Sequence, residues 1–153
     1  MSLPVLELLR KVDLFEGLAA PEIESFAALA HEEVYARGKT ILREGEPVSK
    51  FYVVGAGVVE IGRRGARNGR RRVESGDVFG ELALFEELPS SVEVTAAVTP
   101  ETKLAVWHRF EVQRLMAASP GTALLIARRL FRKIGARLGA MNAVMRAVEE
   151  DLG

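Results

Sequence analysis

Residues 79–94 read FGELALFEELPSSVEV, and this stretch is the starting point for assigning the fold. Gly80 has no Cβ and lets the backbone approach a ligand closely. The N–H groups of Leu82 and Ala83, at the start of a short helix, are placed to bind an anion. Glu81 supplies a fixed acceptor for a hydroxyl group. A Gly-Glu-Leu tripeptide alone is equally explained by a turn that caps a surface helix. The surrounding sequence is therefore needed to choose between a ligand site and such a turn.

The composition fits one compact domain over residues 1–153. Of these 153 residues, 48% are hydrophobic and 27% are charged, and the formal net charge is zero. No long apolar run predicts a membrane span, and the N-terminus MSLPVLELLRKV lacks the basic region and cleavage site of a signal peptide. We therefore expect a cytoplasmic protein. The absence of cysteine excludes disulfides, thiolate zinc sites and cysteine-held iron–sulfur clusters.

The pattern along the chain changes from helix to strand and back to helix. Residues 1–31 read as helical, with Pro21 at the first turn of a helix. Residues 32–107 form short runs rich in Val, Ile, Phe and Tyr, separated by glycines, which predicts seven or eight strands of a barrel, sandwich or jelly roll. Asn68-Gly69 is the strongest hairpin signal, because a type I′ turn needs positive φ at both central residues.

Residues 108–153 are predicted to be helical. Ser119 and Pro120 form a good N-cap and N1 pair, and no proline interrupts the sequence after them. Apolar residues then alternate spacings of four and three, as in the a/d seam of a coiled coil. They are Ile134, Leu138, Met141, Met145, Val148 and Leu152. We expect this seam to form a homodimer, and the alternative is that it packs on the β-structure of the same chain.

Together these features resemble the cyclic nucleotide-binding domain of the Crp/Fnr and protein kinase A regulatory-subunit type. The resemblance rests on VDLFEGLAAPEIESFA (12–27), GKTILREGEPVSKFYVVGAGVVEI (38–61), GDVFGELALF (76–85) and the long final helix. It implies an eight-stranded antiparallel β-roll, a jelly roll, between an N-terminal helical segment and two C-terminal helices. Residues 79–94 would be the phosphate-binding cassette for cAMP or cGMP. Glu81 would bind the ribose 2′-OH, and Gly80, Leu82 and Ala83 would line the phosphate.

The sequence departs from that family at the cassette. The family usually has an arginine after the proline, whereas Pro89 is followed here by Ser90 and Ser91. Loss of a bidentate arginine weakens phosphate binding by roughly ten- to a few-hundred-fold. The helix segment Phe131–Ile134 also lacks the hydroxyl that relatives offer to the purine; Arg132 or Lys133 could replace it, although exposed helix charges are the commoner explanation.

Three hypotheses follow for this pocket. The domain binds a cyclic nucleotide weakly, through amide groups and the hydroxyls of Ser90 and Ser91. It binds a different small polar ligand. Or it binds no ligand and serves as a dimerisation or interaction module.

Other classes of function are not favoured by the sequence. A metal-dependent jelly-roll enzyme needs convergent histidines, but the chain has only His31 and His108, far apart in sequence, so we expect no enzyme, no metal and no cofactor. We assign the two histidines to helix ends and Trp107 to the core. With the sequence ending at Gly153 and no helix-turn-helix, we expect no direct DNA binding. The arginine-rich hairpin 63–72 either meets phosphates or an acidic partner, or is a solvated tip.

Overall fold

The chain folds as ten strands between helices at both ends. The computed structural model describes residues 2–66 and 68–152, and the side chains of Met141 and Leu152 lie outside what it describes. The helical segments are α1 (Val5–Arg10), η1 (Asp13–Phe15), α2 (Ala20–Ala28), the one-turn η2 (Glu81–Leu84), α3 (Arg109–Ala118) and α4 (Pro120–Leu152). The strands are β1 (His31–Ala36), β2 (Lys39–Leu42), β3 (Pro47–Val48), β4 (Lys50–Ala56), β5 (Val59–Gly62), β6 (Arg71–Val73), β7 (Val78–Phe79), β8 (Leu88–Pro89), β9 (Glu93–Ala96) and β10 (Glu101–His108).

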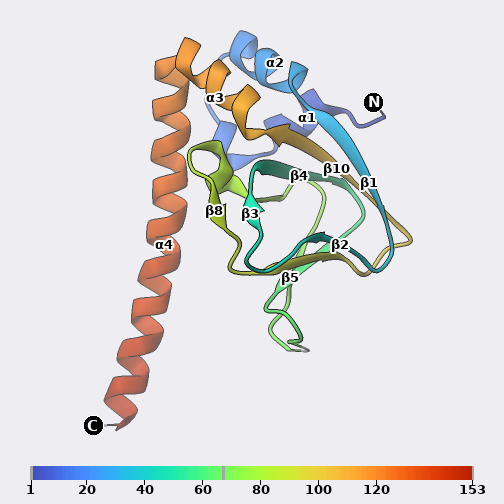
Figure 1. Cartoon of the computed structure of the whole chain (residues 1–153). Helices are drawn as coiled ribbons and strands as arrows, with labels where there is room; N and C mark the ends of the chain where they lie inside the picture. Colours follow the sequence, from blue (N-terminus) through green and yellow to red (C-terminus); the bar gives the residue numbers. More distant parts are fainter. Residues whose placement is uncertain (1, 67, 153) are drawn as a thin grey trace.

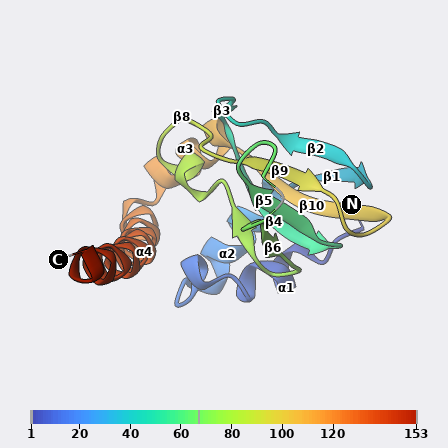
Figure 2. The same cartoon turned by 90° about the horizontal axis from the view of Figure 1, so that it is seen from below.

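The strands form an antiparallel β-roll, which confirms the predicted fold class. One sheet has the order β1-β10-β4-β7, a second has the order β2-β9-β5-β6, and β3 pairs with β8. Figures 1 and 2 show the sheets wrapped around each other, with α1, α2 and α3 gathered at one end of the roll. The structure has more strands than predicted because β3, β7 and β8 have two residues each, too few to show an alternating pattern.

Alternation along β4 and β10 divides the core in two. Phe51, Val53 and Trp107 pack with the helices on one face of the first sheet. Tyr52 and Val54 point to the other face, where they pack with residues of the second sheet. The Trp107 ring is fully buried, and its Nε1–H donates a hydrogen bond of 2.8 Å to the backbone carbonyl of Phe26 in α2. This places Trp107 in the core, as predicted.

The hairpin between β5 and β6 differs from the prediction. The two strands do pair, with Ile61 opposite Arg71, but the connection is longer than a two-residue turn. Gly69 has φ of 78°, whereas Asn68 is not among the residues with positive φ. A type I′ turn at Asn68-Gly69 is therefore wrong. Among the described residues of this loop, the left-handed positions belong to glycines, which have no Cβ to clash there.

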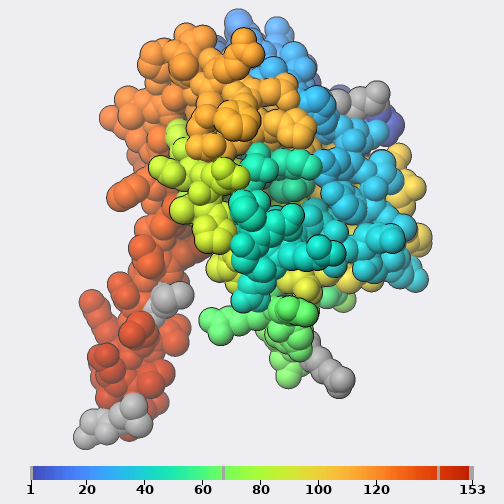
Figure 3. All heavy atoms as spheres, in the orientation of Figure 1, coloured from blue at the N-terminus to red at the C-terminus, as the bar shows by residue number. Residues whose placement is uncertain are grey.

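The final helix begins at Pro120, as the sequence predicts. Its first turns pack on the core through buried Ile126 and Leu130 and partly buried Ile134. Beyond Ile134 the helix runs past the edge of the roll, and Figures 1 and 3 show its C-terminal half standing apart. Among the described residues no helix has the length and hydropathy needed to cross a bilayer.

Candidate functional site

The predicted cassette begins at a turn that only glycine fits. Gly80 connects β7 to η2 with φ of 71° and ψ of 23°, in the left-handed region. A Cβ on Gly80 would lie 2.8 Å from the carbonyl oxygen of Lys50. Both the backbone conformation and the close approach of β4 therefore require a residue without a side chain.

The one-turn η2 presents a different pair of amides from the pair, Leu82 and Ala83, that the sequence suggested. The N–H of Ala83 donates to the carbonyl of Gly80 at 3.1 Å, so it is already used within the turn. The N–H groups of Glu81 and Leu82 make no hydrogen bond to any acceptor in the described part of the chain. These two amides are the ones left to meet a ligand.

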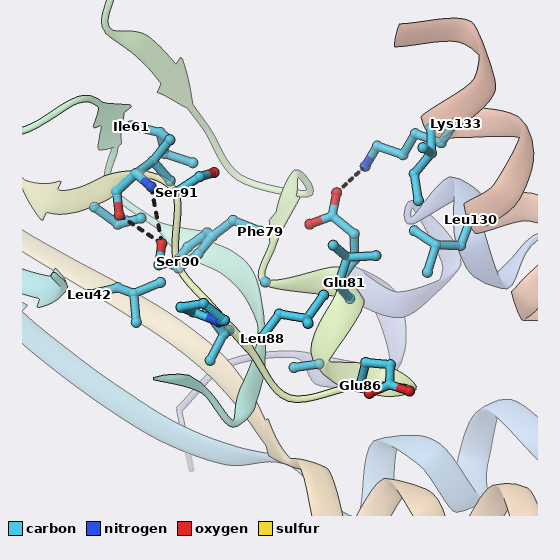
Figure 4. Close-up of a pocket in the computed structure, with 18 of the residues that line it drawn as sticks. Leu42, Ile61, Phe79, Glu81, Glu86, Leu88, Ser90, Ser91, Leu130 and Lys133 are labelled. Atoms are coloured by element: carbon cyan, nitrogen blue, oxygen red, sulfur yellow. Dashed lines mark hydrogen bonds and ion pairs between the residues drawn. The ribbon is translucent and has the colours of Figure 1, made fainter. Parts of the chain in front are cut away.

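A cavity of about 260 Å³ opens beside this turn, between the β-roll and α4. All six residues predicted for the ligand site line it: Gly80, Glu81, Leu82, Ala83, Ser90 and Ser91. Its walls are largely apolar, with Leu42, Ile61 and Phe79 contributed by the roll and Leu130 by the helix (Figure 4). An apolar cavity with a few convergent polar groups is the usual form of a small-molecule site.

The two serines play unequal roles in this cavity. The Ser90 hydroxyl is buried, donates to the carbonyl of Val92 at 2.7 Å and accepts the Val92 N–H at 3.3 Å (Figure 4). The Ser90 N–H donates to the carbonyl of Glu46 at 2.8 Å. Ser90 thus holds the chain in place, and its hydroxyl hydrogen is already donated to Val92 rather than available to a ligand. Ser91 is exposed and lines the cavity.

Glu81 is held by α4. Its carboxylate oxygen Oε1 lies 2.9 Å from Lys133 Nζ and 3.7 Å from Arg137 Nη2 (Figure 4). The Glu81 side chain is only 12% exposed. The expectation that Lys133 is an ordinary exposed helix charge is therefore wrong, whereas Arg132 is exposed.

Basic side chains surround the cavity although the cassette arginine is missing. Arg71 of β6 lines it together with Lys133 and Arg137 of α4, against the two acids Glu81 and Glu86. The lining carries three basic and two acidic side chains, so its net charge is positive and does not repel an anion. The sequence marked Arg71 only as part of hairpin 63–72 and did not mark Arg137, because both lie outside the cassette and reach the cavity only through folding.

The arginine-rich hairpin is not wholly a solvated tip. The Arg70 side chain is 15% exposed, and its guanidinium lies 3.4 Å from Glu60 and 3.5 Å from Glu93. It also donates to the Thr95 hydroxyl at 3.3 Å. Arg70 therefore ties β9 to the hairpin. Arg63 and Arg64 are exposed, and Arg67 lies outside the described residues.

The histidines fill the predicted helix-end roles only in part. His31 is the first residue of β1, and its Nε2 lies 2.9 Å from Glu111 Oε1. His108 is the N-cap residue of α3 but makes no side-chain capping hydrogen bond. The two rings, far apart in sequence, have centroids 4.8 Å apart. The antiparallel pairing of β1 with β10 brings them together, which no local pattern reveals.

Comparison with known proteins agrees with this geometry. Residues 32–119 match the family model described as the cyclic nucleotide-binding domain. The chain is 30% identical over 115 residues to the cAMP-dependent protein kinase regulatory subunit of Colletotrichum orbiculare, covering 75% of this chain and 29% of that protein. It is 29% identical over 140 residues to the CRP-like cAMP-activated global transcriptional regulator of Mycobacterium tuberculosis, covering 89% of this chain and 59% of that protein.

Solved structures share the fold. The N-terminal domain of a transcriptional regulator from Streptomyces coelicolor A3(2) superposes with a TM-score of 0.73 at 28% identity, covering 85% of this chain and 94% of that one. The chain spans less than two thirds of the length of both curated relatives.

Proposed function

The chain belongs to the cyclic nucleotide-binding domain family, and on that premise we propose that it is a regulatory module whose cavity binds a cyclic nucleotide such as cAMP or cGMP. We take residues 1–153 as one such unit. The observation that supports this most directly is that Gly80, Glu81 and Leu82 all line one cavity beside α4. The named roles of the relatives, a cAMP-dependent regulatory subunit and a cAMP-activated regulator, support the ligand class.

The cavity offers each part of such a ligand a partner. The unbonded amides of Glu81 and Leu82 would donate hydrogen bonds to the phosphate of the ligand. The side chains of Arg71, Lys133 and Arg137 supply positive charge nearby. The Glu81 carboxylate accepts a ribose hydroxyl. The purine base would pack against the apolar side chains that line the cavity. Without the cassette arginine the phosphate lacks a bidentate partner, so we expect binding weaker than about micromolar.

The contact of Glu81 with Lys133 suggests how the ligand would act on the rest of the protein. A hydroxyl that binds Glu81 shares this carboxylate with the Lys133 ammonium, and α4 carries Lys133. Occupancy of the cavity would therefore change how α4 is held. This output is regulatory and involves no catalysis.

The exposed C-terminal part of α4 suggests that the protein pairs with a second copy of itself. Leu138, Met145 and Val148 are more than half exposed, whereas Ile134 packs within the chain. The side chains of the other two seam residues, Met141 and Leu152, lie outside the described residues. We propose that this seam pairs with the same seam of a second copy, since a two-fold contact lets one apolar stripe bury itself on its copy. A cytoplasmic location stays a prediction from the sequence.

Two alternatives are tied to specific observations. The engaged hydroxyl of Ser90 and the acid Glu86 favour a small polar ligand without a phosphate. The ion pair of Glu81 with Lys133 favours the second alternative, in which α4 closes the cavity. The domain would then be an interaction module that binds no ligand.

A titration with matched ligands tests the proposal. We expect cAMP to bind the unmodified protein more tightly than 2′-deoxy-cAMP, because Glu81 accepts the missing hydroxyl. The Glu81→Ala variant, which has no side-chain acceptor, should bind both ligands with similar affinity. Calorimetric titration with cAMP, cGMP and the deoxy analogue measures this. No saturable binding of any of them at millimolar concentration would contradict the proposal and leave the two alternatives, which a thermal-shift screen of polar ligands separates.

A further inference from the structure

Three side chains with metal-binding atoms meet where β1, β10 and α3 come together. His31 starts β1, His108 ends β10, and Glu111 lies in the first turn of α3. His31 pairs with Val106, and His108 lies two residues further along β10, so both imidazoles project from the same face of the sheet. One donor atom from each of the three residues lies within 4.8 Å of the others.

We propose that His31, His108 and Glu111 bind one divalent transition-metal ion, with Zn²⁺ as the ion of choice. Two imidazole nitrogens and one carboxylate oxygen form a ligand set that zinc uses, with a fourth position left for water. Nitrogen ligands favour zinc and its neighbours over magnesium and calcium, which prefer oxygen alone. This proposal is independent of the ligand in the cavity.

The spacing of His31 and Glu111 suits such an ion, and His108, whose donor lies within 4.8 Å of theirs, completes the set by a side-chain adjustment. Ligand atoms of a tetrahedral zinc site lie about 3.3 Å apart when the bonds are about 2.0–2.1 Å long. His31 Nε2 and Glu111 Oε1 lie 2.9 Å apart, so they need to separate by only a few tenths of an ångström. The His31 side chain is 51% exposed and that of Glu111 is 38% exposed, which leaves both free to adjust.

The neighbouring charges do not oppose a cation. Lys50 pairs with His108 in register, but its ammonium lies 2.9 Å from the Glu33 carboxylate, which offsets its charge. A bound ion would link β1 and β10 to the first turn of α3. Since α3 leads directly into α4, the ion would fix the base from which the long helix projects.

Metal titration of the full chain tests the proposal. The protein is freed of any polyhistidine tag, stripped with a chelator and titrated with ZnCl₂ in a calorimeter. We expect one Zn²⁺ per chain, and Co²⁺ should bind at the same stoichiometry with the visible absorption of a four-coordinate site. His31→Gln, His108→Gln and Glu111→Gln should each weaken Zn²⁺ binding by at least about tenfold.

The control is Glu24→Gln, which removes an exposed glutamate on α2 and should leave the affinity unchanged. Circular dichroism confirms that each variant is folded. The chain has only two histidines, so no other histidine pair can account for the binding. Absence of saturable Zn²⁺ binding, or a loss smaller than tenfold in any one of the three variants, would overturn the proposal.

Discussion

The Glu81 carboxylate lies 2.9 Å from the Lys133 ammonium and so joins η2 to α4 at the wall of the cavity. Glu81 belongs to the turn that we propose for ligand binding, and Lys133 belongs to the helix that leaves the roll. The pair therefore connects the proposed ligand-binding carboxylate to α4, the helix that carries the proposed dimer seam. Arg137, at 3.7 Å, adds a second and weaker partner.

Removal of the Lys133 ammonium should destabilise the protein. In Lys133→Met the largely buried Glu81 carboxylate keeps Arg137 as its one ionic partner among the described residues. We expect a loss of about 1 kcal/mol in the free energy of unfolding, and a fall of roughly 2–4 °C in Tm. Arg132→Met is the matched control, because Arg132 is the exposed neighbour on the same helix. Equal Tm values for the two variants would show that the pair contributes nothing.

Substitution of Gly80 should separate backbone strain from steric overlap. Gly80→Ala forces a Cβ into the left-handed region and to within 2.8 Å of the Lys50 carbonyl. Gly38→Ala also has positive φ, but its Cβ would meet nothing within 4 Å. We expect about 1–2 kcal/mol of destabilisation for Gly38→Ala, and more for Gly80→Ala. Urea unfolding measures both, and a Gly80→Ala loss no larger than that of Gly38→Ala would mean that the turn relaxes freely.

Charges on the α4 seam should prevent self-association. The double variant Leu138→Glu, Met145→Glu removes two apolar contacts of about 1.5–3 kcal/mol each from either helix. It should sediment as a folded monomer in analytical ultracentrifugation. The control Ala140→Glu, Ala147→Glu adds the same charge on the opposite face of the helix and should stay dimeric. If the unmodified protein is already monomeric at tens of micromolar, the seam does not mediate a dimer.

The fold could be predicted from the sequence because its signals are local. The stretch from Gly80 to Ala83, the glycine-punctuated strands and the Ser119-Pro120 helix start each depend on neighbouring residues. The site could be predicted only in part. Arg71 and Arg137 reach the cavity from β6 and α4, and nothing near them in sequence marks them as lining residues.

Two wrong expectations have the same physical origin. His31 and His108 looked unrelated because strand pairing, rather than sequence spacing, brings them together. Lys133 looked like an exposed charge because its partner Glu81 lies on a distant turn. Long-range pairing of this kind is set by the packed structure, and periodicity in a single sequence does not contain it.

The most direct test of the account is the affinity for cAMP of the unmodified protein and of Ser90→Arg, measured side by side by calorimetry. An arginine at position 90 would restore a bidentate phosphate partner, so we predict that Ser90→Arg binds at least about tenfold more tightly. Ser90→Lys is the matched control, because it adds the charge without the bidentate geometry and should gain less. Submicromolar binding by the unmodified protein, or a folded Ser90→Arg variant with no gain in affinity, would contradict the account.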